Sequence, residues 1–268
     1  MSRASLTFPI VEPGDPRLDD YRHLNDATLR RRLEIEGGFF VVEGWEPVRR
    51  LIGSGWEIRS LLVREDKAHR IADVDAPMYV AAPDLIAAVV GFDLHRGVVA
   101  SAVRPQAVDW GTVCGSSRLL ALLEGINDFE NLGAIFRSAA ALGVDGMLLA
   151  PDVPDPLYRR CVRVSMGAVF LLPFASLEPW PQGILELKRT GFTVLALTPH
   201  PSAKSIESIS SSARTALMFG SEAHGLSPEA LALADERVRI QQSGVLESLN
   251  VGHAAAIAFH WVKSGPGR

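Results

Sequence analysis

Residues 215–263 read TALMFGSEAHGLSPEALALADERVRIQQSGVLESLNVGHAAAIAFHWVK. An apolar run at residues 217–219 stops at Gly220, and a second short run at residues 238–240 stops at another turn, ahead of a helix rich in small residues. This pattern predicts two strands whose carboxyl ends open into neighbouring loops. Ligands of open α/β sheets bind beyond the carboxyl ends of the strands. We therefore expect the chemistry of this protein in these loops.

The chain before this stretch alternates strand patterns with helical ones. The run LLALL within residues 118–126 is typical of a strand buried on both faces, and residues 131–143 place apolar side chains at helical spacing. Such alternation predicts an α/β fold with a mostly parallel sheet that is covered on both faces. Further strands are predicted at residues 146–150, 169–174, 192–197, 217–219 and 238–240.

The N-terminal part predicts a second, smaller α/β unit. Residues 1–20 are rich in Pro, Asp and Gly and have no sustained period, which is typical of an extended lead-in. Residues 105–117 have the composition of a linker. Strands are predicted at residues 39–44, 58–63, 78–80 and 98–103, and a helix at residues 83–90. The predicted domains are residues 1–20 (lead-in), 21–104 (small domain), 105–117 (linker) and 118–268 (main domain).

Composition and charge narrow the classes of function. No apolar run reaches the roughly 20 residues that span a bilayer, and the N-terminus lacks the apolar core of a signal peptide, so we expect a cytoplasmic protein without a membrane partner. The net charge of −4 gives no global reason to expect nucleic acid. Local arginine clusters could bind RNA or could simply be solvated helix faces. They lie at residues 30–32, at residues 49–50 and at residues 159–163.

The cysteines and histidines predict no metal site. Cys114 and Cys161 lie far apart and belong to no CxxC or Cys/His cluster, so both are expected to be buried small residues. His224 has no second histidine or cysteine at ligand spacing. Neither a disulfide framework nor a zinc site is therefore expected.

Two polar residues are prominent in the helix predicted at residues 131–143. Asn131 lies near its N-terminus, where it could be a helix cap or could face a ligand. Arg137 interrupts an apolar pattern. A permanent cation at such a position needs an anionic partner, either a phosphate or a carboxylate of the same chain. Both alternatives stay open for both residues.

The polar side chains within residues 215–263 could likewise be structural or could bind a ligand. Glu222 follows a glycine that allows close approach of a ligand to the backbone, although a lone acidic loop residue is normally solvated. Ser248 precedes the final helix and could cap it, and Asn250 lies next to the start of that helix. Each of these residues taken alone indicates no specific activity.

Together, the segments resemble the signature motifs of the SpoU (TrmH-like) RNA 2′-O-ribose methyltransferases of the SPOUT superfamily. Residues 165–170 (SMGAVF) are also similar to that family, and the segment that begins at Glu43-Gly44 resembles the small L30e-like RNA-binding domain that precedes many of its catalytic domains. The three motifs are NLGAIFRSA at residues 131–139, FGSEAHGLS at residues 219–227 and ESLNV at residues 247–251.

The resemblance implies a parallel sheet with a deep trefoil knot that binds S-adenosylmethionine through backbone groups, and a homodimer that packs through the final helix. One departure is Ile240-Gln241-Gln242 where the family commonly has Ile-Pro-Met. Because proline would fix this turn, the departure leaves the turn freer. The matching cofactor positions are Leu197, Thr198, Gly220, Ile240 and Leu249.

The resemblance also implies roles for the polar residues in methylation of a ribose 2′-hydroxyl. Arg137 would stabilise the developing alkoxide and position an RNA phosphate, because arginine is effectively always protonated. Asn131 and Asn250 would orient the nucleotide or Arg137, Glu222 would hold these donors in place, and Ser248 would bound the site. The proton would leave through another acceptor.

Other functions fit the sequence less well. An α/β hydrolase is excluded because there is no GxSxG elbow, and a Rossmann-type methyltransferase lacks its glycine-rich loop after the first strand. An L30e-like domain favours ribosomal RNA over transfer RNA as the substrate. An inactive RNA-binding protein of the same fold remains the alternative class.

Overall fold

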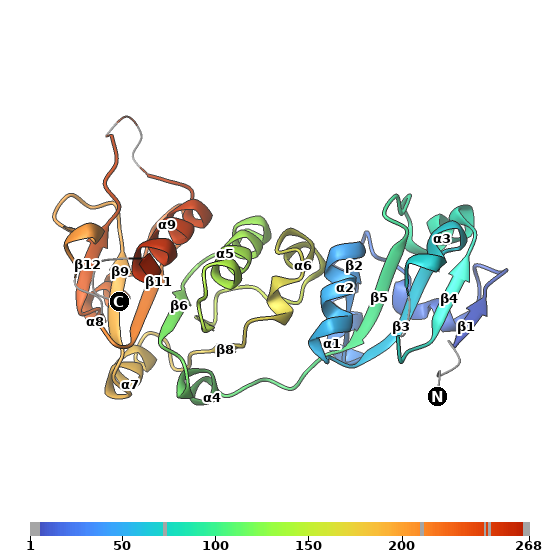
Figure 1. Cartoon of the computed structure of the whole chain (residues 1–268), viewed down its shortest axis with the longest axis horizontal. Coiled ribbons are helices and arrows are strands. Elements are labelled where there is room, and N and C mark those ends of the chain that lie inside the picture. The colour runs from blue at the N-terminus through green and yellow to red at the C-terminus, as the bar shows by residue number, and fades with distance from the viewer. Residues whose placement is uncertain (1–5, 72–73, 210–211, 244, 246–247, 265–268) are drawn as a thin grey trace. The chain divides into compact units, whose positions relative to one another are not determined.

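A computed structural model describes residues 6–71, 74–209, 212–243, 245 and 248–264 (Figure 1). The chain forms two compact units. The first unit comprises Met1–Gln106 together with Leu157–Phe170, and the second comprises Ala107–Pro156 and Leu171–Arg268. No helix in the described ranges is long and apolar enough to cross a membrane.

In the described part of the first unit, a five-stranded sheet has the order β1-β4-β3-β5-β2. The strands predicted at residues 39–44, 58–63, 78–80 and 98–103 are confirmed, as is the helix at residues 83–90. The strands are β1 (Thr7–Pro9), β2 (Phe39–Glu43), β3 (Ile58–Arg64), β4 (Met78–Ala81) and β5 (Val98–Val103). The helices that precede β5 are η1 (Pro16–Tyr21), α1 (Ala27–Glu36), α2 (Trp45–Ser54), η2 (Glu65–Arg70) and α3 (Pro83–Val90).

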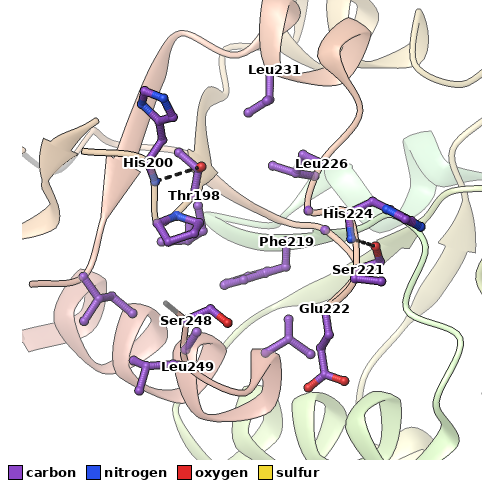
Figure 2. A pocket seen from close by; sticks show the side chains of 18 of the residues that line it. Thr198, His200, Phe219, Ser221, Glu222, His224, Leu226, Leu231, Ser248 and Leu249 are labelled. Atoms are coloured by element: carbon purple, nitrogen blue, oxygen red, sulfur yellow. Dashed lines mark hydrogen bonds between the residues drawn. The ribbon is translucent and has the colours of Figure 1, made fainter. Parts of the chain in front are cut away.

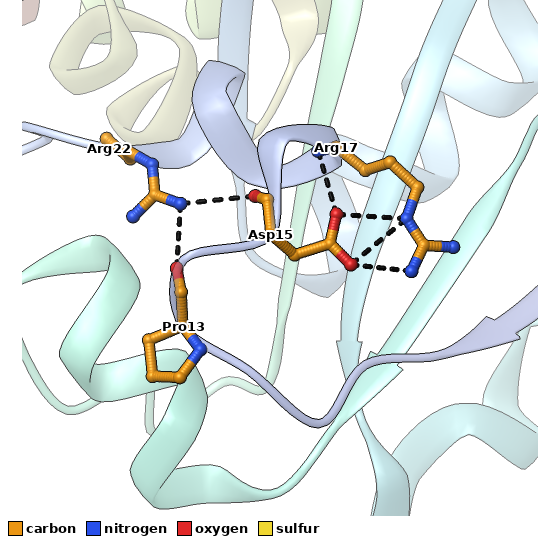
Figure 3. Close-up of polar contacts among 4 residues, drawn as sticks. All are labelled: Pro13, Asp15, Arg17 and Arg22. Carbon is orange, nitrogen blue, oxygen red and sulfur yellow. Dashed lines mark hydrogen bonds and ion pairs between the residues drawn. The ribbon is translucent and has the colours of Figure 1, made fainter.

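The predicted extended lead-in is part of this unit. The strand β1 pairs in parallel with β4, and η1 buries Leu18 and Tyr21 completely. Figure 3 shows how polar contacts order the turn before η1: Asp15 accepts hydrogen bonds from the backbone and side chain of Arg17, and Arg22 donates to the carbonyl of Pro13 over 2.7 Å. The prediction of an extended lead-in was wrong for residues 7–20. Polar contacts order this segment, and such contacts produce no hydrophobic period that the sequence could reveal.

The segment Leu157–Phe170 packs within the first unit, whereas the predicted boundaries put it in the main domain. It contains α6 (Arg159–Val164) and η3 (Ala168–Phe170). Arg159 forms an ion pair of 2.9 Å with Glu43 and donates to the carbonyl of Leu24. The ring of Phe170 lies against those of Phe40 and Trp56.

The strand predicted at residues 169–174 is also wrong. Gly167 has a φ of +79°, and the chain then forms η3, whose three residues are buried. The extended conformation begins only at Phe174, directly after Pro173. The apolar residues 168–170 are thus buried in a short 3-10 turn and not in a strand. A short apolar run fits either structure, so the local sequence could not distinguish them.

In the described part of the second unit, a seven-stranded sheet has the order β10-β12-β9-β11-β6-β7-β8. Every pairing in it is parallel, as predicted. The strands are β6 (Leu119–Leu123), β7 (Gly146–Leu149), β8 (Phe174–Ser176), β9 (Thr193–Leu197), β10 (Lys204–Ser205), β11 (Thr215–Phe219) and β12 (Glu236–Arg239). The helices are α4 (Trp110–Gly115), α5 (Phe129–Ala141), α7 (Gly183–Arg189), η4 (Ile206–Ser208), α8 (Pro228–Leu233) and α9 (Val251–Ser264).

Helices cover this sheet. Residues of α4, α7 and α8 share one apolar cluster with the strands, and α5 lies beside α9 (Figure 1). The rings of Phe219 in β11 and Phe259 in α9 are 5.4 Å apart and nearly perpendicular. Cys114 and Cys161 are both buried, as predicted. Burial raises the pKa of the Cys114 thiol to about 11, so this thiol stays protonated at neutral pH.

Replacing Arg159 by Ala should destabilise the first unit, because the Glu43 side chain, only 10% exposed, would lose its cation. Leaving a buried charge unpaired is strongly unfavourable, and for this partly solvated pair we expect a loss of about 2 kcal/mol. The measurement is the opening free energy of β2 amides, obtained from hydrogen exchange. Arg163→Ala is the control, since Arg163 is an exposed residue of the same helix. Equal effects of the two substitutions would contradict the prediction.

Candidate functional site

A cavity of about 630 Å³ opens beyond the carboxyl ends of β9, β11 and β12. Figure 2 shows Thr198 and His200 on one side of it, His224 and Glu222 on another, and Ser248 and Leu249 on a third. The walls come from the loops that were expected to hold a ligand. The lining residues predicted from the sequence are Leu197, Thr198, Gly220, Glu222, Ile240, Ser248 and Leu249.

The loop after β11 forms one wall and folds back on itself. The N–H of Ser221 donates to the carbonyl of Gly225 over 3.1 Å, and the N–H of Gly225 donates in return over 2.9 Å. A Cβ atom at Gly220 would lie 2.2 Å from the carbonyl carbon of Gly225. Only glycine therefore fits at residue 220 when the loop is closed in this way.

The loop after β9 forms a second wall. The N–H of Thr198 donates to the carbonyl of Val238 over 2.9 Å, which joins this loop to β12. The Thr198 hydroxyl accepts from the N–H of His200, and the His200 ring is held through Nδ1 by Ser202. His200 was not predicted from the sequence, although its position between two prolines after a strand marks a turn at the ligand-binding edge.

A hydrogen-bonded network joins the three motifs. The side-chain N–H₂ of Asn250 donates to Asn131 and to Glu222, each over 2.8 Å. The side-chain oxygen of Asn250 accepts from the backbone N–H groups of Gly252 and His253 and so caps α9. The amide of Asn250 therefore orients the other two side chains and starts the last helix.

The hydrogen bonds at the starts of α5 and α9 show which residues cap these helices. The cap of α5 is Asp128, whose carboxylate accepts from the N–H of Glu130. Asn131 is therefore not the cap, and its side-chain oxygen instead accepts from Asn250. The capping interactions at α9 come from Asn250, while Ser248 lines the cavity. Glu247, the first residue of the third motif, lies outside the described residues.

Arg137 is an exposed residue of α5. It forms no hydrogen bond or ion pair with any residue that the structure describes, so the alternative of an intrachain partner finds no support within those ranges. Arg137, Asn131 and Asn250 are not among the residues that line the cavity.

No cluster of metal-ligating side chains is present within the described ranges. The site therefore consists of a cavity with both apolar and polar walls, an adjoining amide–carboxylate network and a separate arginine. A cavity at the carboxyl edge of a parallel sheet is where open α/β folds bind small molecules.

Comparison with known proteins identifies the family. The model of the SpoU rRNA Methylase family matches residues 118–260, which is more than half of the chain, so this protein belongs to that family and is an RNA methyltransferase. An uncharacterized tRNA/rRNA methyltransferase of Mycobacterium tuberculosis is 43% identical over 94% of this chain and 90% of its own length. The resemblance found in the three motifs is confirmed.

Two further relatives are similar over nearly the whole chain. The 23S rRNA (guanosine(2553)-2'-O)-methyltransferase of Bacillus subtilis is 26% identical over 95% of this chain and 98% of its own length. The SpoU methyltransferase AviRb of Streptomyces viridochromogenes, solved in complex with AdoMet, has a TM-score of 0.78 at 25% identity over 92% of this chain and 97% of its own. The α/β fold with a parallel sheet therefore matches that of SPOUT methyltransferases.

Replacing Asn250 by Asp should break the network while keeping an oxygen that caps α9. A carboxylate at residue 250 would face that of Glu222 at the present 2.8 Å contact, and we expect a loss of about 1 kcal/mol in unfolding free energy. The double variant Asn250→Asp/Glu222→Gln restores a donor opposite an acceptor and should recover most of this loss. Urea unfolding of both single variants and the double variant measures the coupling. Simple additivity would rule out a direct interaction.

Proposed function

We propose that this protein methylates a ribose 2′-hydroxyl of structured RNA with S-adenosylmethionine as the methyl donor, and that the RNA is ribosomal. The main support is that all the predicted cofactor positions, namely Leu197, Thr198, Gly220, Ile240 and Leu249, line one cavity. The 2′-O-methyltransferase from Bacillus subtilis and the AdoMet-bound structure of AviRb support the same reaction.

The cavity residues fit S-adenosylmethionine. A volume of about 630 Å³ lies within the usual range for a ligand of this size, roughly 300–1,000 Å³. Leu197, Ile240 and Leu249 would provide apolar contacts for the cofactor, and the close turn at Gly220 would let it approach the backbone. The Glu222 carboxylate, which also lines the cavity, would complement the positive charge of the cofactor. When bound, the cofactor supplies an electrophilic methyl group.

Arg137 is proposed to act on the RNA. A guanidinium group does not give up its proton near neutral pH, so Arg137 stabilises the developing 2′-alkoxide and holds an adjacent phosphate. Its lack of a partner among the described residues suits this role. Asn131 and Asn250 orient the nucleotide, Glu222 fixes Asn250 through their 2.8 Å hydrogen bond, and Ser248 bounds the cavity. The proton leaves through another acceptor.

The first unit is proposed to be an L30e-like domain that binds the RNA. The segment that begins at Glu43-Gly44 carries the resemblance, and similarity to the Bacillus subtilis enzyme extends over 95% of this chain, including this unit. That relative acts on 23S rRNA, which favours ribosomal RNA here. A transfer RNA substrate is the alternative within the same reaction.

The second unit is proposed to contain a deep trefoil knot and to form a homodimer through α9. This helix is rich in small residues, which allow close approach of a second helix. Ile257 on α9 is 43% exposed and Leu249 just before it is 37% exposed. Apolar side chains at these positions suit burial against a second copy of the chain.

Replacing Arg137 by Ala should reduce methyl transfer at least about 100-fold, because the alkoxide would lose its stabilising cation. Affinity for S-adenosylhomocysteine, measured by calorimetry, should change by less than about twofold, since Arg137 is not among the residues that line the cavity. Transfer of a tritiated methyl group to unmodified ribosomal RNA measures the activity. Arg189→Ala is the control, because Arg189 is an exposed arginine of the same unit.

The same assay decides between the alternatives. Near-normal turnover of Arg137→Ala would refute the role of Arg137. Binding of RNA by the wild-type protein without any transfer to total RNA would instead indicate an inactive RNA-binding protein. Comparing ribosomal and transfer RNA from cells that lack the gene identifies the substrate class.

Replacing Ile257 by Asp should convert the homodimer to a monomer, because a charge would be buried in the interface. Light scattering after size-exclusion chromatography measures the mass. Leu185→Asp is a matched control, since Leu185 is 41% exposed on α7 of the same unit. A dimer that persists in the Ile257 variant would exclude this face of α9 as the interface.

A further inference from the structure

Glu124 is a buried acidic residue with no part in the proposed reaction. It follows β6 directly and is only 7% exposed. It is not among the residues that line the cavity. A carboxylate that is withdrawn from solvent requires hydrogen-bond donors around it, and the positions of these donors indicate what Glu124 does.

Glu124 holds both ends of the loop that follows β11. At the start of the loop, the N–H of Glu124 donates to the carbonyl of Phe219 over 3.0 Å. At its end, the carboxylate accepts from the N–H and from the hydroxyl of Ser227, each over 2.7 Å. The loop residues 220–226, which form one wall of the cavity, are therefore fastened to β6 through a single residue.

The carboxylate has a further donor on another segment. The indole N–H of Trp180 donates to the same Glu124 oxygen that accepts from the Ser227 hydroxyl, over 2.7 Å. A carboxylate offers only acceptors, whereas a glutamine amide offers one acceptor and one donor group. A glutamine at this position would consequently turn an N–H₂ group toward either Ser227 or Trp180.

We propose that Glu124 is a positioning residue that sets the shape of the cavity loop for S-adenosylmethionine. The inference rests on the proposed function of the cavity. The two ends of the loop pack closely, because a Cβ atom at Gly220 would lie 2.2 Å from the carbonyl carbon of Gly225. Since the loop is this tightly closed, the points at which its ends are fixed place its backbone groups. The backbone N–H of Glu124 fixes the start of the loop and its carboxylate fixes the end.

The test compares Glu124→Gln with Asp145→Asn. Asp145 is a matched control because its carboxylate accepts from the N–H groups of Arg118 and Leu119, each over 2.8 Å, at the opposite end of β6. Both substitutions replace one carboxylate oxygen by N–H₂ beside backbone donors. Asp145 accepts both bonds on one oxygen, which asparagine retains, whereas Glu124 uses both of its oxygens. Only the donors of Glu124 include the end of the cavity loop.

Hydrogen exchange of the ligand-free protein is the first measurement. In Glu124→Gln, amides of residues 221–227 should exchange at least about tenfold faster than in the wild type, while Asp145→Asn should leave them unchanged. Calorimetry with S-adenosylhomocysteine is the second measurement. Glu124→Gln should weaken binding by about tenfold or more, and Asp145→Asn by less than about twofold.

Trp180→Phe provides a milder variant if Glu124→Gln does not fold. It removes the indole donor and leaves the bonds to Ser227, so loop exchange and ligand affinity should change in the same direction but by less. Unchanged loop exchange in folded Glu124→Gln, or equal weakening of binding in Glu124→Gln and Asp145→Asn, would overturn the inference. Failure of the wild-type protein to bind S-adenosylhomocysteine would refute the proposed function instead, since loop exchange does not depend on that ligand.

Discussion

The parallel pairing of β11 between β6 and β9 is the constraint on which the site depends. Thr215 to Phe219 of β11 lie in register with Leu119 to Leu123 of β6, and Thr215 to Met218 with Thr193 to Ala196 of β9. Parallel strands in register end at the same edge of the sheet. Residues that are far apart in the sequence therefore emerge together there, and the chain can combine their backbone and side-chain groups around one cavity.

Polar side chains then connect the loops at this edge. Asn250 caps α9 with its oxygen and joins Asn131 to Glu222 with its nitrogen. An amide can do both because it carries an acceptor and a donor group on one planar side chain. Arg137 forms no such connection to the described residues. An arginine with no partner among the described residues, on the same helix as Asn131, suits a site that an external anion completes.

The first unit depends in a similar way on residues distant in the sequence. Arg159 and Phe170 reach its core from the segment Leu157–Phe170, which the family model includes in its match. Arg159 pairs with Glu43, and Phe170 packs against aromatic rings of the sheet and of the turn after α2. The boundary between the units therefore does not coincide with one point along the chain, and a linker composition at residues 105–117 could not reveal this.

The sequence by itself determined the alternation of strands and helices in the second unit, the turn at Gly220 and the motifs that identify the family. These are properties of local periodicity, of backbone conformation and of spacing along the chain. Only the tertiary structure decided that residues 7–9 join the first sheet, that Asp128 and Asn250 rather than Asn131 and Ser248 provide the caps, and that Glu124 fastens the cavity loop. The caps are local bonds, but each helix start has more than one polar side chain that could provide them, and the sequence does not show which one does. The pairing of β1 with β4 and the bonds of Glu124 to Ser227 join residues that are distant in the sequence. Local pattern contains no information about which distant donor will meet a given acceptor.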